Sequence, residues 1–385
     1  MNEQNISFET SDSTKSIQQA TRDFAQKEIK PIIMKYDESQ EFPRELFSKL
    51  GEMGYLGAVV SDEFGGASLS HIDFVAIIEE IAKIDPSVAL SVSAHNGLCV
   101  GHINQFGSIE QKKKFLPDLC SGKKLGGWGL TEAFSGSDAG GMKTFAEKIS
   151  GGWILNGSKN FITHGSVGET FVVLAKTDRE SKHKNISAFI VEKSMKGFSV
   201  GKKENKLGMR SSDTASIIFS DLFLPDENLI GEVGKGFHQT LGVLDGGRIG
   251  IAALSVGLAQ GALDASLKYS KERIQFGHAI GDFQAIQWKL AEMGTEISAA
   301  RLLTYKAAHD KMLGKDFHLI AAEAKYFASE VAVKCATESV QIFGGYGYIK
   351  DFPVEKFYRD AKLLTIGEGT SEVQKMVIAR SVLNL

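Results

Sequence analysis

The hydrophobic periodicity of this chain changes twice, and no other feature of the sequence constrains the fold as strongly. Apolar residues recur at helical spacing from about Thr14 to Lys124, alternate with a period of two between Leu125 and Glu232, and return to helical spacing after Gly236. The strand patterns follow one another closely, which favours an antiparallel barrel or sandwich over a parallel sheet. We therefore expect an α+β protein with helices and strands in separate layers.

The C-terminal part has the pattern of a helical bundle. Ile286, Leu290, Met293 and Ile297 mark one face of a helix over roughly 283–312. Similar stripes cover 237–274, 319–342 and 371–383, so we predict a four-helix bundle. A chain of 385 residues exceeds the usual size of one core. We expect an N-terminal helical domain (1–124), a middle β domain (125–235) and a C-terminal helical bundle (236–385).

Charge and cysteine content argue against several classes of function. The net charge of -3 gives no basic footprint for nucleic acid. Three cysteines without CxxC spacing indicate neither a disulfide framework nor a zinc site, and we predict no metal. The first residues are polar and no apolar run reaches membrane-spanning length. We expect a cytoplasmic protein without a signal peptide or a membrane span.

One carboxylate near the end of the chain is placed as a reaction centre would place it. Glu368 lies between Gly367 and Gly369, just before a helix start, and the glycines allow a ligand to come close. Thr370 or Ser371 can cap that helix, and Ser371 with Gln374 has the spacing of a capping box. Taken alone, the stretch is also compatible with a solvated turn.

The common nucleotide and hydrolase signatures are absent from the sequence. No GxGxxG follows a strand pattern, and neither GxSxG nor HExxH occurs. The run 152–157 has P-loop spacing, but Ser158 stands where the lysine should be. A Rossmann site, a P-loop, a serine hydrolase elbow and a zinc protease site are therefore not indicated.

Glycine-rich loops at element ends are the remaining candidates for ligand binding. The loop 126–141 could line a flat aromatic ligand with its tryptophan and hydroxyls, or serve as a flexible linker. Adjacent Gly246 and Gly247 cost about 2 kcal/mol in a helix, which indicates close approach of another group. Arg273, Phe276 and Gln284 offer a guanidinium, a ring and an amide suited to pyrophosphate and adenine. The run 341–348 is a second close-approach turn.

Together and in this order, these segments resemble the acyl-CoA dehydrogenase family, closest to short-chain or butyryl-CoA enzymes, over nearly the whole chain. The resemblance implies the three domains above, a homotetramer, FAD bound across a subunit interface, an acyl-CoA substrate and electron-transfer flavoprotein as the electron acceptor. The FAD positions that it implies are Trp128, Leu130, Thr131, Gly136, Ser137, Phe161, Ile162, Thr163, Arg273, Phe276, Gln284, Gln341, Gly344, Gly345, Thr370, Ser371 and Glu372. The substrate positions are Ser137, Asp245, Gly246, Gly247, Arg248, Gly367 and Gly369.

The resemblance assigns Glu368 as the catalytic base. The α-proton of a thioester is too weakly acidic for an unassisted carboxylate. Hydrogen bonds from the Glu368 N–H and a flavin ribityl hydroxyl would stabilise the enolate, and desolvation would raise the pKa of Glu368. The base would take the α-proton while the β-hydride passes to flavin N5, which gives a trans-2-enoyl-CoA. Some relatives carry the base just before Arg248, but here Gly247 occupies that position.

Several residues depart from the family pattern. Ala133-Phe134 replaces the usual Pro-Gly, and His164 replaces a common asparagine. Gly367 replaces a tyrosine, which predicts a wider acyl pocket and admits branched or somewhat longer chains. The absence of arginine between Asp85 and His102 disfavours a substrate with a second carboxylate. The alternatives are an oxidase or flavin monooxygenase on the same fold, and a non-catalytic acyl-CoA-binding module.

Overall fold

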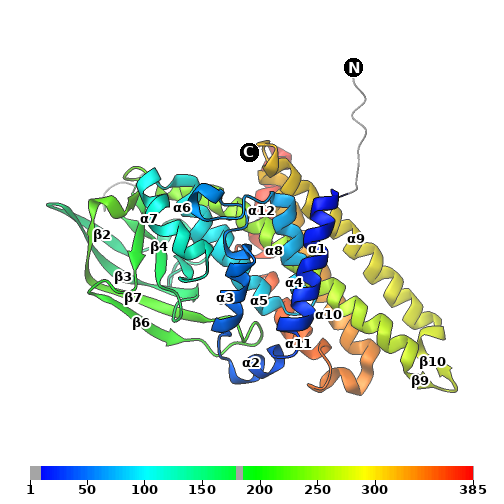
Figure 1. The fold of residues 1–385 in the computed structure, drawn as a ribbon. Helices are drawn as coiled ribbons and strands as arrows, with labels where there is room; N and C mark the ends of the chain where they lie inside the picture. Colours follow the sequence, from blue (N-terminus) through cyan, green and yellow to red (C-terminus); the bar gives the residue numbers. More distant parts are fainter. Residues whose placement is uncertain (1–9, 179–184, 385) are drawn as a thin grey trace.

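The computed structural model describes residues 10–178 and 185–384, with helices at both ends of the chain and a β-sheet domain between them (Figure 1). Asp85 caps α5 by accepting a hydrogen bond from the Val88 N–H at 2.7 Å, and Pro86 occupies the first helical position. The N-terminal elements are α1 (Asp12–Phe24), η1 (Ala25–Ile29), α2 (Ile33–Ser39), α3 (Arg44–Glu52), η2 (Tyr55–Gly57), η3 (Asp62–Phe64), α4 (His71–Ala82), α5 (Pro86–Ala94), η4 (His95–Val100), α6 (Gly101–Phe106) and α7 (Ile109–Cys120).

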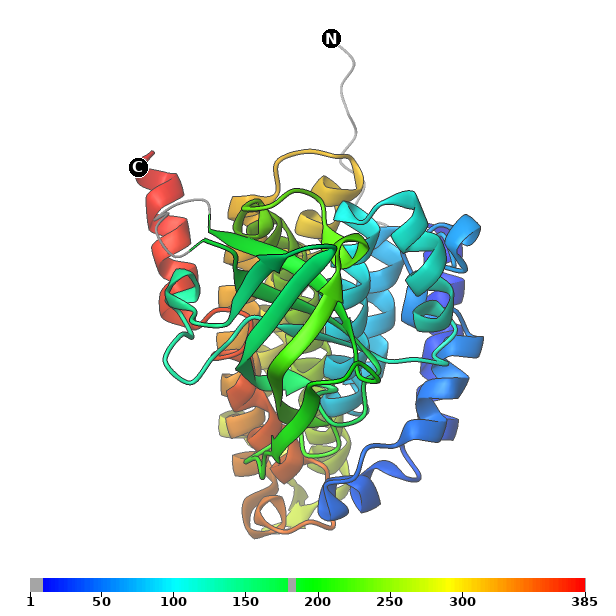
Figure 2. The same cartoon turned by 90° about the vertical axis from the view of Figure 1, so that its left-hand side faces the viewer.

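The middle domain is one mainly antiparallel sheet in the order β6-β7-β3-β2-β4-β5-β8. Two pairings are parallel. All four residues of β1 pair with β4, and β2 pairs with β4 at one residue pair. Figure 2 shows this sheet in front of the helices. Its elements are β1 (Gly126–Gly129), η5 (Ala139–Gly141), β2 (Phe145–Ile149), β3 (Gly152–Thr163), β4 (Thr170–Lys176), β5 (Ile186–Glu192), β6 (Phe198–Lys203), β7 (Thr214–Pro225), η6 (Asp226–Asn228) and β8 (Leu229–Ile230).

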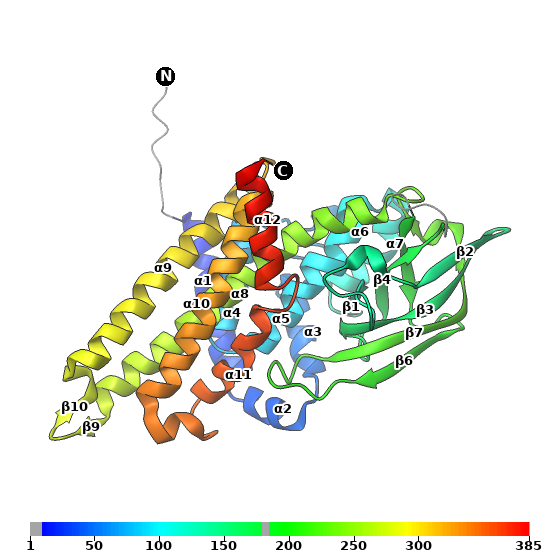
Figure 3. The same cartoon turned by 180° about the vertical axis from the view of Figure 1, so that it is seen from behind.

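The C-terminal helices agree closely with the predicted stripes. The elements are α8 (Gly236–Glu272), β9 (Ile274–Gln275), β10 (His278–Ala279), η7 (Ile280–Asp282), α9 (Gln284–Met312), α10 (His318–Phe343), η8 (Gly344–Tyr348), α11 (Val354–Leu364) and α12 (Ser371–Leu383). Helices α8, α9 and α10 pack on one another, and α11 and α12 pack against α10 (Figure 3). The predicted α+β fold class is confirmed. Helix α11 was not predicted.

Helix α8 is the central helix of the molecule because small residues let other helices approach it. A Cβ added at Gly257 would lie 2.4 Å from the Glu79 carbonyl oxygen of α4, and one at Gly261 would lie 2.4 Å from the Lys83 carbonyl oxygen. Among the described residues, α8 alone is long and apolar enough to cross a membrane, but 72% of that window is buried within the protein. That burial is typical of a core helix.

Candidate active site

Glu368 lies in a tight turn between α11 and α12. The backbone is left-handed at Glu368 (φ 52°) and at Gly369 (φ 94°), and only the glycine adopts this conformation readily. Thr370 caps α12 by accepting a hydrogen bond from the Val373 N–H at 3.3 Å. The turn therefore presents the glutamate outside both helices, as the sequence indicated.

The predicted capping box between Ser371 and Gln374 is wrong, because both side chains bond elsewhere. The Ser371 hydroxyl donates to Glu330 Oε1 at 2.6 Å, which ties the start of α12 to α10. The Gln374 amide donates to the carbonyl oxygens of Glu368 and Gly369 at 3.3 and 3.1 Å. These contacts stabilise the left-handed turn instead of the helix N-terminus.

The Glu368 carboxylate packs against α8 at Gly247. A Cβ added at Gly247 would lie 2.1 Å from Glu368 Oε2, so a larger residue there would displace the carboxylate. Glu368 as a residue is partly exposed, but Oε2 is buried and has no hydrogen-bond partner in the described ranges. Burial raises the pKa of Glu368 to about 7, against the opposing effects of Lys325 and Arg248. The close approach predicted at Gly247 is the approach of this carboxylate.

Arg248 belongs to a chain of charged groups beside the carboxylate. Its Nη1 donates to Asp245 Oδ1 at 2.6 Å, while its buried Nε finds no partner in the described part of the chain. His318 Nδ1 lies 3.0 and 3.1 Å from the two Asp245 carboxylate oxygens. A Cβ added at Gly246 would lie 2.5 Å from Lys311 Nζ, so this glycine leaves room for the lysine. The structure places Asp245, Gly247 and Arg248 beside Glu368, and Gly246 beside Lys311.

Lys325 lies near Glu368 and is not among the site residues predicted from the sequence. It lies on α10 with its side chain fully buried, and its Nζ donates to the Gly369 carbonyl oxygen at 2.6 Å. The signal was present in the sequence, since Lys325 falls on the same helical stripe as Ala321 and Ala328, both buried. A lysine at a core position of an amphipathic helix needs a buried partner.

The predicted flavin loop and strand end lie side by side. The Asn160 N–H donates to the Thr131 carbonyl oxygen at 2.8 Å, which joins the loop after β1 to the end of β3. The Trp128 indole donates to His102 Nδ1 at 3.1 Å and is buried in one apolar cluster with Leu130. Leu98 packs against that cluster and reaches within 3.3 Å of a Cβ added at Gly247. These contacts place the loop and the base in one neighbourhood.

The residues at the end of β3 and just after it differ in exposure, with Thr163 half-buried. Ile162 is buried in the sheet core, whereas Phe161 is 64% exposed and has a left-handed backbone (φ 57°). His164, which replaces the usual asparagine, is fully buried against Phe42 and Phe47, and its Nδ1 lies 3.0 Å from the Gly126 carbonyl oxygen. Phe161 is therefore free to contact a ligand, while His164 supports the core.

A second group of predicted FAD residues lies far from Glu368 within one chain. Arg273 follows Gly247 by 26 positions along α8, which corresponds to about 39 Å. Arg273, Gly344 and Gly345 line a cavity of about 480 Å³ near the β9–β10 hairpin. Figures 1 and 3 show the hairpin at the end of the molecule away from the sheet. Within one chain, Arg273 is therefore separated from the neighbourhood of Glu368 by most of the length of α8.

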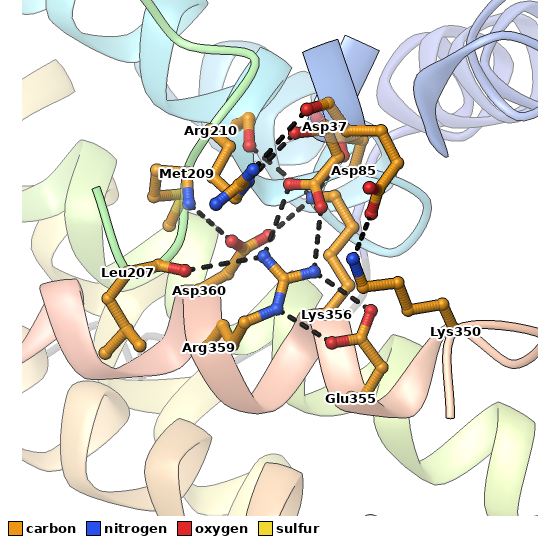
Figure 4. Close-up of polar contacts among 12 residues, drawn as sticks. Asp37, Asp85, Leu207, Met209, Arg210, Lys350, Glu355, Lys356, Arg359 and Asp360 are labelled. Carbon is orange, nitrogen blue, oxygen red and sulfur yellow. Dashed lines mark hydrogen bonds and ion pairs between the residues drawn. The ribbon is translucent and has the colours of Figure 1, made fainter. Parts of the chain in front are cut away.

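The helix that leads into the base turn, α11, is held where the three domains meet (Figure 4). Lys356 lies between two buried carboxylates, with its Nζ 2.6 Å from Asp85 Oδ2 and 2.5 Å from Asp360 Oδ2. Arg359 donates to Asp37 Oδ2 at 2.7 Å. These ion pairs join α11 to α2 and to the start of α5. The direction in which α11 delivers the base is therefore fixed by buried charge.

The residues present fit FAD, the cofactor expected from the sequence. An added Cβ at Gly136, Gly344 or Gly345 would meet no atom within 4 Å, so backbone at these positions is open to a ligand. The start of α12 lies beside Glu368, and the partial positive charge of a helix N-terminus is suited to phosphate. Phe161 would contact the flavin ring, and the 131–137 loop with the start of α12 would hold its phosphates.

Three family models for acyl-CoA dehydrogenases match the chain: the N-terminal domain at residues 11–123, the middle domain at 127–222 and the C-terminal domain at 234–383. The short-chain specific acyl-CoA dehydrogenase of Clostridium acetobutylicum is 47% identical over 95% of this chain and 97% of that protein. The caffeyl-CoA reductase-Etf complex subunit CarC of Acetobacterium woodii is 43% identical over 97% of this chain and 99% of that protein. Butyryl-CoA dehydrogenase from Megasphaera elsdenii superposes with a TM-score of 0.96 at 43% identity, covering 98% of this chain and all of that chain. With the buried Oε2 of Glu368 and the open flavin loop, these matches show that the chain belongs to the acyl-CoA dehydrogenase family of FAD-dependent enzymes.

Proposed function

We propose that Glu368 abstracts the α-proton of a short acyl-CoA, with room for branching in the acyl group, to give the trans-2-enoyl-CoA. The observation that carries this proposal is the buried, unpartnered Oε2 beside Gly247. A desolvated carboxylate with a pKa of about 7 is a stronger base than a solvated one. FAD, when bound, accepts the hydride from Cβ.

The Glu368 turn also offers a donor for the thioester oxygen. The Glu368 N–H makes no backbone hydrogen bond within the described part of the chain. A donor aimed at the thioester oxygen stabilises the charge that develops when the α-proton leaves. Arg248 and Asp245 lie next to the carboxylate and would bind the CoA portion of the substrate.

The absence of a side chain at Gly367 supports a bulky acyl group. A Cβ added there would make only ordinary contacts, the nearest being 3.6 Å from the Leu363 carbonyl oxygen, so the fold can accept a larger residue. Gly367→Tyr should therefore fold and bind FAD, but its ring should fill the space beside the base. We expect its kcat/KM for branched acyl-CoAs to fall at least about tenfold relative to butyryl-CoA.

This expectation is checked by anaerobic flavin bleaching with a panel of straight, branched and dicarboxylic acyl-CoAs. The flavin of the wild-type enzyme should be reduced by both butyryl-CoA and branched acyl-CoAs. The flavin of the Gly367→Tyr variant should be reduced by butyryl-CoA alone. An equal change for all chains would contradict the proposed pocket, and reduction by none of them in wild type would contradict the proposed substrate class.

We propose electron-transfer flavoprotein as the electron acceptor. The name of the Acetobacterium woodii relative, a subunit of a reductase-Etf complex, supports this partner. After anaerobic reduction with butyryl-CoA, we expect slow reoxidation by dissolved oxygen and at least about hundredfold faster reoxidation by added electron-transfer flavoprotein. Stopped-flow absorbance measures both rates. Rapid hydrogen peroxide formation without the partner protein would instead identify an oxidase.

We propose a homotetramer in which a second copy completes the FAD site. Trp288 and Leu302 on α9 are 63% and 55% exposed, and Phe276 at the hairpin is 91% exposed. Large apolar side chains that are exposed together mark association surfaces. The distance between Arg273 and the base neighbourhood within one chain supports the same arrangement, because a second copy would bring its own Arg273 and Gly344 to the cofactor.

A further inference from the structure

Lys325 is buried beside the base with few groups to balance its charge. Its Nζ has one close oxygen, the Gly369 carbonyl at 2.6 Å, and makes no ion pair within 4 Å among the described residues. Burial lowers the pKa of Lys325 to about 8, and the nearby Glu368 carboxylate is the strongest influence that raises it. An ammonium group in such a place is costly unless it acts on a neighbouring charge.

The turn that carries the base needs external support. Glutamate disfavours the left-handed conformation that Glu368 adopts, and the neighbouring Gly369 is also left-handed. Lys325 from α10 and Gln374 from α12 both donate to the Gly369 carbonyl oxygen. The two donors come from different helices, so the turn is held from two sides.

Charged groups face Glu368 from α8, α10 and α12. Arg248 of α8 is already paired with Asp245, which also contacts His318. Lys325 of α10 is the larger of the two cationic influences on the carboxylate, ahead of Arg248. Glu330 and Glu372 act on Lys325 from α10 and α12. From the η4 side the neighbour is the apolar Leu98.

We propose that Lys325 is a positioning residue for the base: it fixes the Glu368–Gly369 turn through the Gly369 carbonyl and favours the ionised carboxylate before substrate binds. The proposal rests on the function proposed for Glu368. It assigns to a core lysine of α10 a role in proton abstraction that does not require contact with the substrate.

Lys325→Met tests this role because methionine fills the same space without the charge or the donor. Removing an influence that lowers the pKa of Glu368 should raise that pKa above about 7, so the base becomes ionised only at higher pH. We expect the acid limb of the pH profile to move up by about one unit or more, which corresponds to about tenfold slower proton abstraction on that limb. The profile is measured by loss of α-deuterium from butyryl-CoA, followed by mass spectrometry, and by flavin bleaching.

Lys334→Met is the matched control, because Lys334 lies on the same helix but pairs with Glu292 and Glu296 at the surface. Its profile should superimpose on that of wild type. If Lys325→Met does not retain FAD, the pH profile of Lys325→Gln is measured instead. Its acid limb should move in the same direction. A folded Lys325 variant with the wild-type pH profile would overturn the proposal. Persistent activity of Glu368→Gln would instead overturn the assignment of the base.

Discussion

Glu368→Gln should lose α-proton abstraction while keeping FAD and acyl-CoA binding. Glutamine has the shape of the glutamate but cannot accept the proton, and general bases contribute about a hundred- to ten-thousandfold to the rate. We expect a loss of that size in flavin bleaching by butyryl-CoA and in α-deuterium exchange. The flavin absorbance spectrum should remain that of wild type, because the turn and its Lys325 and Gln374 contacts involve the backbone carbonyls of Glu368 and Gly369.

The control for this loss is Glu110→Gln, which makes the same change at an exposed carboxylate in the first turn of α7. Its activity should equal that of wild type. Bleaching by Glu368→Gln at a rate within a few-fold of wild type would show that another group takes the proton. Loss of the flavin spectrum would show that the substitution disturbs the fold, and Glu368→Asp would then separate the two effects through its own exchange rate.

Lys356→Met should cause the largest loss of stability among single changes in the ion-pair cluster of Figure 4. The side chain is 2% exposed and lies between Asp85 and Asp360, both fully buried. Without the lysine, two carboxylates remain buried close together and lack their cation. Breaking one side of a buried ion pair costs about 3–5 kcal/mol, which we expect as the decrease in the free energy of unfolding.

Lys350→Met provides the comparison, because Lys350 in the same figure pairs with Glu38 at the surface, where 61% and 51% of the side chains are exposed. Such a pair contributes little to stability. Urea unfolding in saturating FAD, followed by tryptophan fluorescence, measures both variants. Equal midpoints for Lys356→Met and Lys350→Met would show that Lys356 does not stabilise the junction. Lowered activity of Lys356→Met at temperatures where it remains folded would further show that α11 positions the base.

The helices and strands were predictable because long elements repeat one period many times. The stripe predicted over 371–383 coincides with α12, and those over 283–312 and 319–342 end within one residue of α9 and α10. Helix α11 was missed because it is short and carries five charged residues, Glu355, Lys356, Arg359, Asp360 and Lys362. Two of them, Lys356 and Asp360, are buried against each other, which a hydrophobic pattern does not register.

The local geometry of the site was predictable where glycines mark it. The glycines around Glu368 indicated its turn before α12, and the adjacent glycines of α8 indicated a close neighbour, which Gly247 does receive. Lys325 and His318 could not be found in this way, because their partners lie 44 and 73 positions away in the chain. The capping box failed for a related reason, since Thr370 and not Ser371 is the N-cap, and the Gln374 amide donates to the carbonyl oxygens of the turn.

The contact between Gly247 and the Glu368 carboxylate also bears on how such enzymes change over evolutionary time. The carboxylate from the loop before α12 occupies the space that a side chain from α8 would otherwise enter. Either segment could therefore deliver an acid to the same point, while the other remains small to leave room. A family built this way can exchange the sequence position of its base without moving the place where the proton is taken. In a sequence alignment, enzymes that share one chemistry would then differ at the positions of both Gly247 and Glu368.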